Sequence, residues 1–125
     1  MRANRPVFLN LWRIKFPVTA IISILHRISG VIIFLGLPFL LYTLHRSLLS
    51  QDHFDQLLLT LNRLDIKLLL WIIASAFCWH FLSGVRHLLM DIGWGEKWPA
   101  ARTHAFFTLG LSVIVVILLG VWICL

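Results

Sequence analysis

Charged residues are scarce in this chain of 125 residues, where 13% are Asp, Glu, Lys or Arg and 60% are hydrophobic. Soluble globular domains carry about a quarter charged residues. The shortage therefore excludes a soluble enzyme or binding module of ordinary composition. Acidic residues are the scarcest, with five against 11 Lys and Arg, so the formal net charge is +6 at pH 7. We interpret this excess as a signal of membrane topology, and not of nucleic-acid binding.

Cysteine is almost absent, with Cys78 and Cys124 as its two occurrences. Four ligands are typical of an iron–sulfur cluster, and this chain cannot supply them from cysteine. The sequence also has no CxxC pair, no CxxCH haem attachment, no HExxH and no phosphate-binding loop. We expect both cysteines to be small buried hydrophobes without a disulfide between them. We also expect no internal repeat.

The chain contains long runs of apolar residues. Three of them, at about 20–45, 66–90 and 104–125, are long enough to cross roughly 30 Å of hydrocarbon as helices. The sequence therefore predicts an all-α membrane protein with three transmembrane helices, forming a single anchor domain over residues 1–125. Pro38 is expected to kink the first helix. Because three helices enclose little interior, we expect them to be part of a heteromeric helical bundle.

The N-terminal segment 1–18 is basic with interspersed apolar side chains, and it lacks the order of a cleavable signal peptide. We expect it to lie on the membrane surface or to dock on a soluble partner. Eight of the 11 Lys and Arg residues lie in this segment, near the start of the first span, or around the loop between the second and third spans. The positive-inside rule therefore predicts a cytoplasmic N-terminus and a C-terminus on the far side.

His80 lies near the middle of the second apolar run, where no water is available to its ring nitrogens. Neutral imidazole is a common ligand of haem iron, so His80 is a candidate axial ligand. Gly84 and His87 follow on the same helix face. Gly84 leaves room for a flat macrocycle, and His87 lies about 10 Å along the axis, a reach that suits propionates.

Two other interpretations of His80 stay open at this point. One is a hydrogen bond to a carbonyl of a neighbouring helix, and the other is an ion or proton site. Arg86 lies one position off the face of His80 and His87. We interpret it as an interfacial cation that snorkels toward the headgroups.

A second polar face lies at the start of the first span, where Ser23, His26, Arg27 and Gly30 recur at spacings of three and four. This depth suits a quinone, whose carbonyl oxygens accept hydrogen bonds from a hydroxyl and a cation such as those of Ser23 and Arg27. His26 could relay protons or pair with a propionate. The alternative is an ordinary Arg–His pair that anchors the helix. We expect His26 to lie too near the surface to share one iron with His80.

Two stretches of the chain resemble the signatures of a known family. Residues 16–30 read FPVTAIISILHRISG, and residues 80–91 read HFLSGVRHLLMD. Together with Arg5 and Pro6, they resemble the cytochrome b556 subunit of succinate dehydrogenase, and the resemblance spans essentially the whole chain. The third apolar run contributes to this resemblance only through its hydropathy.

The resemblance implies roles for individual residues. His80 is implied to be an axial ligand of haem b iron, with the second ligand supplied by a partner anchor subunit. Ser23 and Arg27 are implied to line a quinone site, with ubiquinone favoured as the quinone. His26, Arg27 and His87 are implied to lie near the haem propionates.

The resemblance also implies partners and a location. The chain would be one of two small cytochrome b anchors of respiratory complex II in a bacterial inner membrane, with its N-terminus cytoplasmic and its C-terminus periplasmic. An iron–sulfur subunit and a flavoprotein subunit would complete the complex and pass electrons from succinate to quinone in the tricarboxylic acid cycle. The chain alone would be non-catalytic. The alternatives are the anchor of a fumarate reductase, a haemless structural anchor and, less consistent with the sequence, a small transporter subunit.

Overall fold

The structure is a computed structural model that describes residues 15–125, so most of the predicted surface segment 1–18 lies outside the described residues. Its helices are α1 (Val18–Leu49), α2 (Gln51–Leu61), α3 (Leu64–Asp91) and α4 (Trp98–Cys124). Residues 15–125 contain no strand, and α1, α3 and α4 are each long and apolar enough to cross a membrane. The predicted all-α class with three membrane-spanning helices is confirmed.

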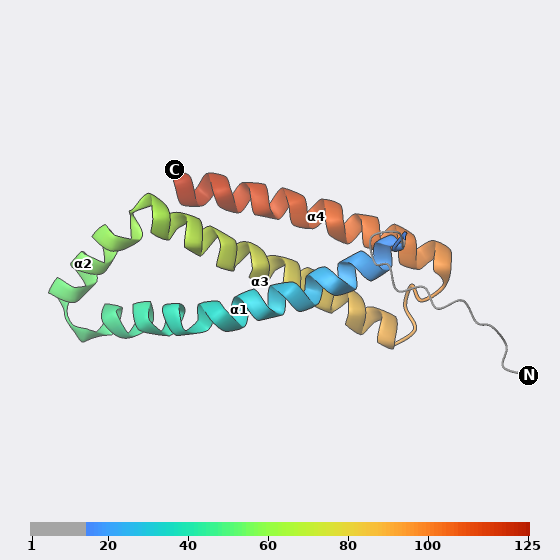
Figure 1. Cartoon of the computed structure of the whole chain (residues 1–125), viewed down its shortest axis with the longest axis horizontal. Coiled ribbons are helices and arrows are strands. Elements are labelled where there is room, and N and C mark those ends of the chain that lie inside the picture. Colours follow the sequence, from blue (N-terminus) through green and yellow to red (C-terminus); the bar gives the residue numbers. More distant parts are fainter. Residues whose placement is uncertain (1–14) are drawn as a thin grey trace, which may run out of the picture.

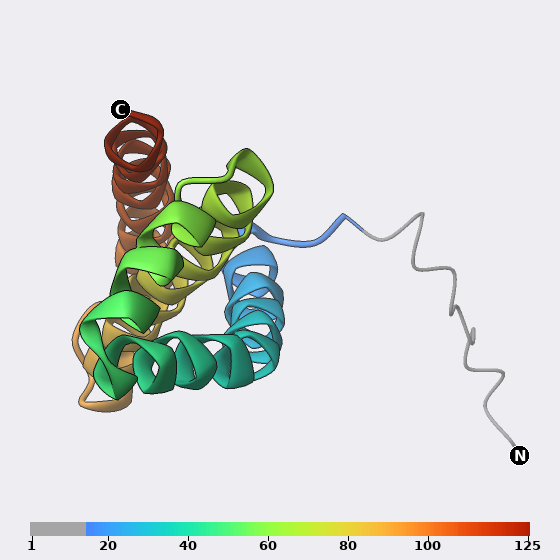
Figure 2. The same ribbon diagram turned by 90° about the vertical axis from the view of Figure 1, so that its left-hand side faces the viewer.

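The three long helices extend beyond the apolar runs that predicted them. The largest difference is at α4, which begins at Trp98 and has Pro99 in its first turn. Proline is tolerated there because the first N–H groups of a helix have no intrahelical partner. Pro38 lies inside α1, and Figure 2 shows α1 changing direction in its middle. A proline removes one helical hydrogen bond and clashes with the preceding turn, which accounts for this bend.

The long helices run back and forth along one axis (Figure 1). The short helix α2 joins α1 to α3 at one end, and its N-cap Ser50 accepts a hydrogen bond from the backbone N–H of His53. α4 lies along α3, and the indole N–H of Trp71 donates to the carbonyl oxygen of Val116 at 3.0 Å. The start of α1, the end of α3 and the start of α4 therefore meet at the end opposite α2 (Figure 1).

Small residues form most of the interior. Among the described residues, the buried side chains include Ser29, Ala76, Ser83, Ala105 and Ser112. Small side chains let membrane helices approach closely, because dispersion contacts and hydrogen bonds hold helices together where water does not drive them. Only six hydrophobic residues are buried within residues 15–125. Most of the other large apolar side chains are exposed, as expected of helices that meet lipid or further helices.

The cysteines are both free, and the absence of a disulfide between them agrees with the prediction. Cys78 is partly buried, but Cys124 is exposed at the end of α4. The expectation that both are buried is therefore wrong for Cys124, which lies in the last helical turn with no neighbouring helix to cover it.

Gly36 sets the distance between α1 and α3. A Cβ at Gly36 would lie 2.9 Å from Cδ1 and 3.0 Å from Cγ1 of Ile73, closer than packed atoms tolerate. Replacing Gly36 with valine is expected to cost about 1–3 kcal/mol of folding free energy, because overpacking forces the helices apart. Unfolding in mixed detergent micelles measures this loss. The matched control is Gly110→Val, since a Cβ at Gly110 meets nothing within 4 Å. Equal effects of the two substitutions would contradict the role of Gly36.

Candidate functional site

Three histidines from two helices converge in the half of the molecule where α1 begins. His26 of α1 and His80 of α3 stack their rings, with centroids 4.0 Å apart and planes at 12°. His87 meets the ring of His26 edge-on, with the centroids 5.4 Å apart. The structure therefore brings together side chains that the sequence places on separate faces of two helices.

The two helices meet through the same five-residue pattern, which is HRISG from His26 and HFLSG from His80. Nδ1 of His26 lies 2.7 Å from Oγ of Ser83, and Nδ1 of His80 lies 3.2 Å from Oγ of Ser29. Each histidine thus contacts the serine of the other helix. We call these two pentapeptides the HxxSG pair. The two pentapeptides share three of five residues, a similarity too short to count as an internal repeat, and their relation is recognised only when the helices are seen to pack together.

The glycines of the HxxSG pair are reciprocal as well. A Cβ at Gly84 would lie 3.3 Å from Cε1 of His26, and a Cβ at Gly30 would lie 3.2 Å from Cε1 of His80. Each ring therefore packs over the glycine of the opposite helix. The space at Gly84, which the sequence analysis reserves for a flat macrocycle, is taken by the imidazole of His26.

The backbone carbonyl of His26 determines the proton position on His80. Nδ1 of His80 lies 3.1 Å from this oxygen, which also accepts a hydrogen bond of 2.7 Å from Oγ of Ser29. A carbonyl oxygen only accepts, so we infer that Nδ1 carries the hydrogen and that Nε2 of the neutral ring keeps its lone pair. The carbonyl interaction that the sequence analysis treats as an alternative is present, and it leaves Nε2 available as a ligand.

Ser83 gives His26 the same tautomer. Its side chain is fully buried, and its Oγ donates to the carbonyl oxygen of Trp79 at 2.7 Å. Because its single hydrogen is committed there, Oγ accepts from Nδ1 of His26. Nε2 of His26 is then unprotonated too. Ser29 and Ser83 are the site residues that sequence reasoning missed, and the repeated HxxSG pattern is the signal that could have identified them.

The stacking of His26 and His80 excludes one arrangement. The nitrogen lone pairs of an imidazole lie in its ring plane, so two rings stacked face to face with their centroids 4.0 Å apart cannot point at one iron from opposite sides. We expected His26 to lie too near the surface to share an iron with His80. That reason is wrong, because the two rings lie side by side at 4.0 Å. The stacking of the rings, and not their depth, therefore excludes both histidines as ligands of the same iron.

Ser23 and Arg27 lie on α1 beside His26, one helical turn apart. Ser23 is partly buried and Arg27 is exposed, so both side chains remain accessible to a ligand or to another protein. His26 points instead toward α3, where it meets Ser83. The polar face predicted at the start of the first span therefore divides into an inward part at His26 and an outward part at Ser23 and Arg27.

A cavity of about 360 Å³ opens beside the HxxSG pair, and Ser29, Ser75 and Trp79 are among its lining residues. Oγ of Ser75 and Nε1 of Trp79 are buried there without a hydrogen-bond partner among the described residues. Buried polar atoms normally have partners. This side of α3 therefore presents two polar atoms that a cofactor or a neighbouring subunit could satisfy.

Arg86 does not join this site. It is only 5% exposed, and its Nη2 donates to the carbonyl oxygen of Ala101 on α4 at 3.2 Å. Successive helical residues are about 100° apart, which turns Arg86 away from the face of His87. The interpretation of Arg86 as a snorkelling interfacial cation is therefore wrong, because α4 covers it.

Comparison with known proteins identifies relatives over nearly the whole chain. A family model described as succinate dehydrogenase/fumarate reductase transmembrane subunit matches residues 1–119. The succinate dehydrogenase cytochrome b556 subunit of Coxiella burnetii is 45% identical over 124 residues, which cover 98% of this chain and 99% of that protein. The subunit of the same name from Rickettsia typhi is 33% identical over 119 residues, covering 94% and 92% of the two chains. A cytochrome b560 subunit from Marchantia polymorpha is 36% identical over 99 residues, covering 74% and 72%.

Proposed function

Because this chain belongs to the succinate dehydrogenase/fumarate reductase transmembrane subunit family, we propose that it anchors a succinate:quinone oxidoreductase in the membrane, binds haem b and forms part of the quinone-reduction site. The chain would be non-catalytic alone. The family description covers both directions of the reaction, but the relatives named above are succinate dehydrogenase subunits. That observation favours succinate oxidation over the anchor of a fumarate reductase.

His80 is the proposed axial ligand of the haem iron. The observation that carries this proposal is the hydrogen bond from Nδ1 to the carbonyl oxygen of His26, which leaves Nε2 of a neutral ring free. Histidines that bind metals typically donate their other ring N–H to a carbonyl or carboxylate, which fixes both tautomer and orientation. When bound, the haem would supply one-electron redox chemistry. The second axial ligand would come from a partner anchor, since the stacked ring of His26 cannot supply it.

Cationic and imidazole groups next to His80 fit the anionic edge of a haem. The rings of His26 and His87 contact each other edge-on, and Arg27 follows His26 on α1. We propose that these three side chains hold the propionates. Charge-assisted hydrogen bonds to carboxylates are about twice as strong as neutral ones. Arg27 would donate as a permanent cation, whereas His26 and His87 would donate such bonds from protonated rings.

The quinone site is proposed at Ser23 and Arg27. The Ser23 hydroxyl can donate to one quinone oxygen, and the Arg27 guanidinium can donate while its charge stabilises the negative charge that develops as electrons arrive. A guanidinium that is already in position stabilises this charge without reorganisation of its surroundings. His26 precedes Arg27 on α1 with its ring on the side of α3, and its unprotonated Nε2 would accept a proton and pass it on.

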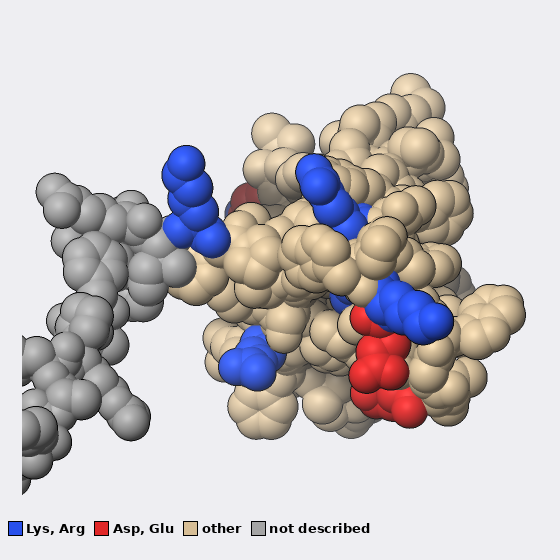
Figure 3. Space-filling model, turned by 90° about the vertical axis from the view of Figure 1, so that its right-hand side faces the viewer, with Lys and Arg blue, Asp and Glu red and all other residues tan. Residues whose placement is uncertain are grey.

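Partner subunits complete the proposal. Only six hydrophobic residues are buried within residues 15–125, so large apolar faces remain for lipid and for a second small cytochrome b anchor. Figure 3 shows Lys and Arg side chains spread around the end of the molecule where α1 begins. An iron–sulfur subunit would dock at this end, near Ser23 and Arg27, and carry electrons from a flavoprotein subunit.

The membrane orientation is tested by reporter fusions. The chain is a multi-pass membrane protein, and we propose the bacterial inner membrane with a cytoplasmic N-terminus. Because the C-terminus lies at the end of the molecule opposite the start of α1, alkaline phosphatase fused after Leu125 is expected to be active in the periplasm. The same reporter fused after Glu96, in the loop between α3 and α4, is expected to be inactive. The reverse pattern would show that the orientation is inverted.

The function is tested by purifying the complex through a tag on this chain. A dithionite-reduced minus oxidised visible spectrum is expected to show a b-type α-band, and succinate–quinone activity is expected to co-purify with a flavoprotein, an iron–sulfur protein and a second small membrane subunit. Activity and partners without a band would indicate a haemless structural anchor. A band without succinate oxidation would instead refute the proposed complex.

A further inference from the structure

Arg86 is a charged side chain enclosed by protein. It is 5% exposed, its Nη2 donates to the carbonyl oxygen of Ala101, and its Nε is buried without a hydrogen-bond partner among the described residues. A guanidinium group has five N–H donors in a planar fork. A single carbonyl acceptor therefore leaves most of this donor capacity, and all of the charge, without a partner among the described residues.

No carboxylate of the described chain neutralises Arg86. Within residues 15–125 the ion pair that forms is Arg63 with Asp65, on the far side of the molecule at the start of α3. Burying an unpaired charge is very costly, and such groups are normally paired with an opposite charge. The anion that pairs with Arg86 must therefore come from outside the described residues.

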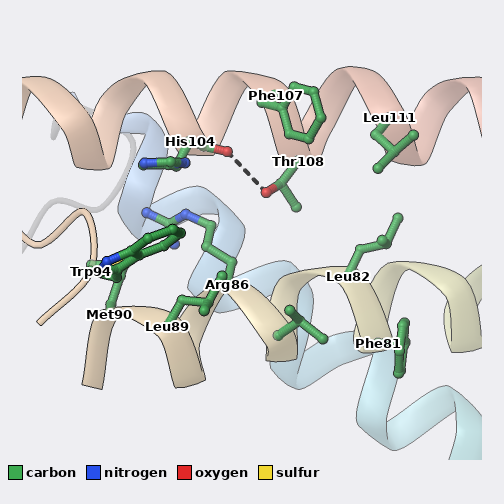
Figure 4. A pocket seen from close by; sticks show the side chains of 11 residues that line it. Phe81, Leu82, Arg86, Leu89, Met90, Trp94, His104, Phe107, Thr108 and Leu111 are labelled. Carbon is green, nitrogen blue, oxygen red and sulfur yellow. Dashed lines mark hydrogen bonds between the residues drawn. The ribbon is translucent and has the colours of Figure 1, made fainter. Parts of the chain in front are cut away.

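A cavity of about 220 Å³ lies directly beside this guanidinium, between the second half of α3 and the first half of α4. Figure 4 shows Arg86 directed toward α4, with Trp94 and His104 around its charged end. The rest of the cavity is apolar and continues between Leu82 and Leu111 (Figure 4). One end of the cavity thus offers hydrogen-bond donors, and the other offers hydrocarbon.

The mouth of this cavity is held by the loop between α3 and α4. Gly93 and Gly95 have φ of 85° and 74°, values that glycine adopts readily and other residues rarely adopt. A Cβ at Gly95 would lie 2.7 Å from Cδ2 of His104, so the loop packs directly on α4. This close packing fixes Trp94 over the cavity.

The depth of Arg86 matches the level of lipid phosphates. Arg86 is five residues before the end of α3 at Asp91, which is about 7–8 Å along the helix axis. A cation one to two turns inside the end of a spanning helix lies near the boundary of hydrocarbon and headgroups. The neighbouring Lys97 and Arg102 are exposed cations at the same end, which disfavours a headgroup that carries its own positive charge.

We propose that this cavity binds one anionic phospholipid, with its phosphate on the guanidinium of Arg86 and one acyl chain along the apolar lining toward Leu82 and Leu111. Free phosphate would leave that lining empty, so the lipid is the better match. The site is separate from the HxxSG pair, because His80 faces α1 whereas Arg86 faces α4. The inference does not depend on haem or quinone binding.

Lipid retention by the full chain tests this inference. The tagged chain, together with the proteins that assemble with it, is transferred into phosphatidylcholine nanodiscs that contain a minor fraction of phosphatidylglycerol, and native mass spectrometry counts the lipids that stay bound on release. The wild type is expected to retain phosphatidylglycerol in preference to phosphatidylcholine. Arg86→Met is expected to lower that retention about tenfold, because charge-assisted hydrogen bonds to the phosphate are lost. Arg102→Met, which removes an exposed cation at the same end, is the matched control and is expected to retain the lipid.

A second variant separates the site from a folding defect. Leu111→Trp fills the apolar end of the cavity while leaving Arg86 unchanged, and it is expected to lose the lipid as well. No preference for phosphatidylglycerol in the wild type, or equal retention by all variants, would overturn the proposal. Unchanged lipid retention in Arg86→Met with loss of a partner subunit would also overturn it, by identifying a protein carboxylate as the anion. Haem absorbance recorded on the same samples reports on the proposed function independently.

Discussion

Replacing His80 with leucine is expected to abolish or shift the b-type α-band of the purified complex. Leucine matches the apolar surroundings of α3 but has no ring nitrogen, so the iron would lose the ligand atom Nε2. The hydrogen bond from Nδ1 to the carbonyl oxygen of His26, which orients the ring, would disappear with it. A reduced minus oxidised spectrum and a pyridine haemochrome count of haem per complex measure the result.

Two further variants make the result for His80 specific. His45→Leu removes an exposed histidine of α1 at the far end of the helix and is expected to leave the band unchanged. His26→Leu is expected to keep the b-type band, because the proposed ligand His80 and its hydrogen bond to the backbone carbonyl of residue 26 would remain. Unchanged haem content and an unchanged band in His80→Leu would refute the ligand assignment.

Replacing Arg27 with leucine is expected to slow quinone reduction by about 10²-fold, the loss typical of removing one preorganised donor from a developing negative charge. Succinate oxidation by an artificial dye should stay close to the wild-type rate, since the dye takes electrons before they reach the membrane. Arg27 is exposed and does not support the packing of α1, so the substitution should leave assembly intact. Parallel assays of the two activities in one preparation measure the difference.

The control for Arg27 is another exposed arginine at the same end of the molecule. Arg102→Leu removes the same charge from α4, where the guanidinium lies 5.8 Å from the ring centroid of Phe106. It is expected to change neither activity by more than about twofold, as is usual for exposed positions away from special features. If Arg27→Leu lowered both activities equally, the residue would support assembly and would not act at the quinone site.

The sequence was sufficient to predict the fold class and the placement of His80, Gly84 and His87 on one face of α3, where all three meet His26. Runs of apolar residues longer than the bilayer core leave few alternatives to membrane-spanning helices, and residues three and four apart share a helix face. The position of His80 in the second span followed from this reasoning. Contacts between helices did not follow, because helices that are apolar all round give no sign of which neighbour each face meets.

The HxxSG pair and Arg86 show which information the sequence lacked, namely the contacts between helices. His26 and Ser83 are separated by 57 residues along the chain, and nothing in their local spacing indicates that they form a hydrogen bond. Arg86 looked like an interfacial cation because arginines near helix ends usually reach the headgroups. The small side chains of Ala101 and Ala105 let α4 approach closely enough to bury it, and this outcome depends on tertiary packing.

The HxxSG pair contains two histidines in similar surroundings for which different functions are proposed. His26 and His80 have the same tautomer, each contacts the serine of the other helix, and each packs over the glycine of the other helix. The clearest chemical difference between the two pentapeptides is the residue that follows the histidine. That residue is Arg27 after His26 and Phe81 after His80. A positive charge disfavours a metal cation beside it and favours anionic groups, whereas an aromatic ring adds no charge. Under the proposed function, a single charged side chain would break the symmetry of this short pattern, directing one copy toward carboxylates and quinone and leaving the other for the iron.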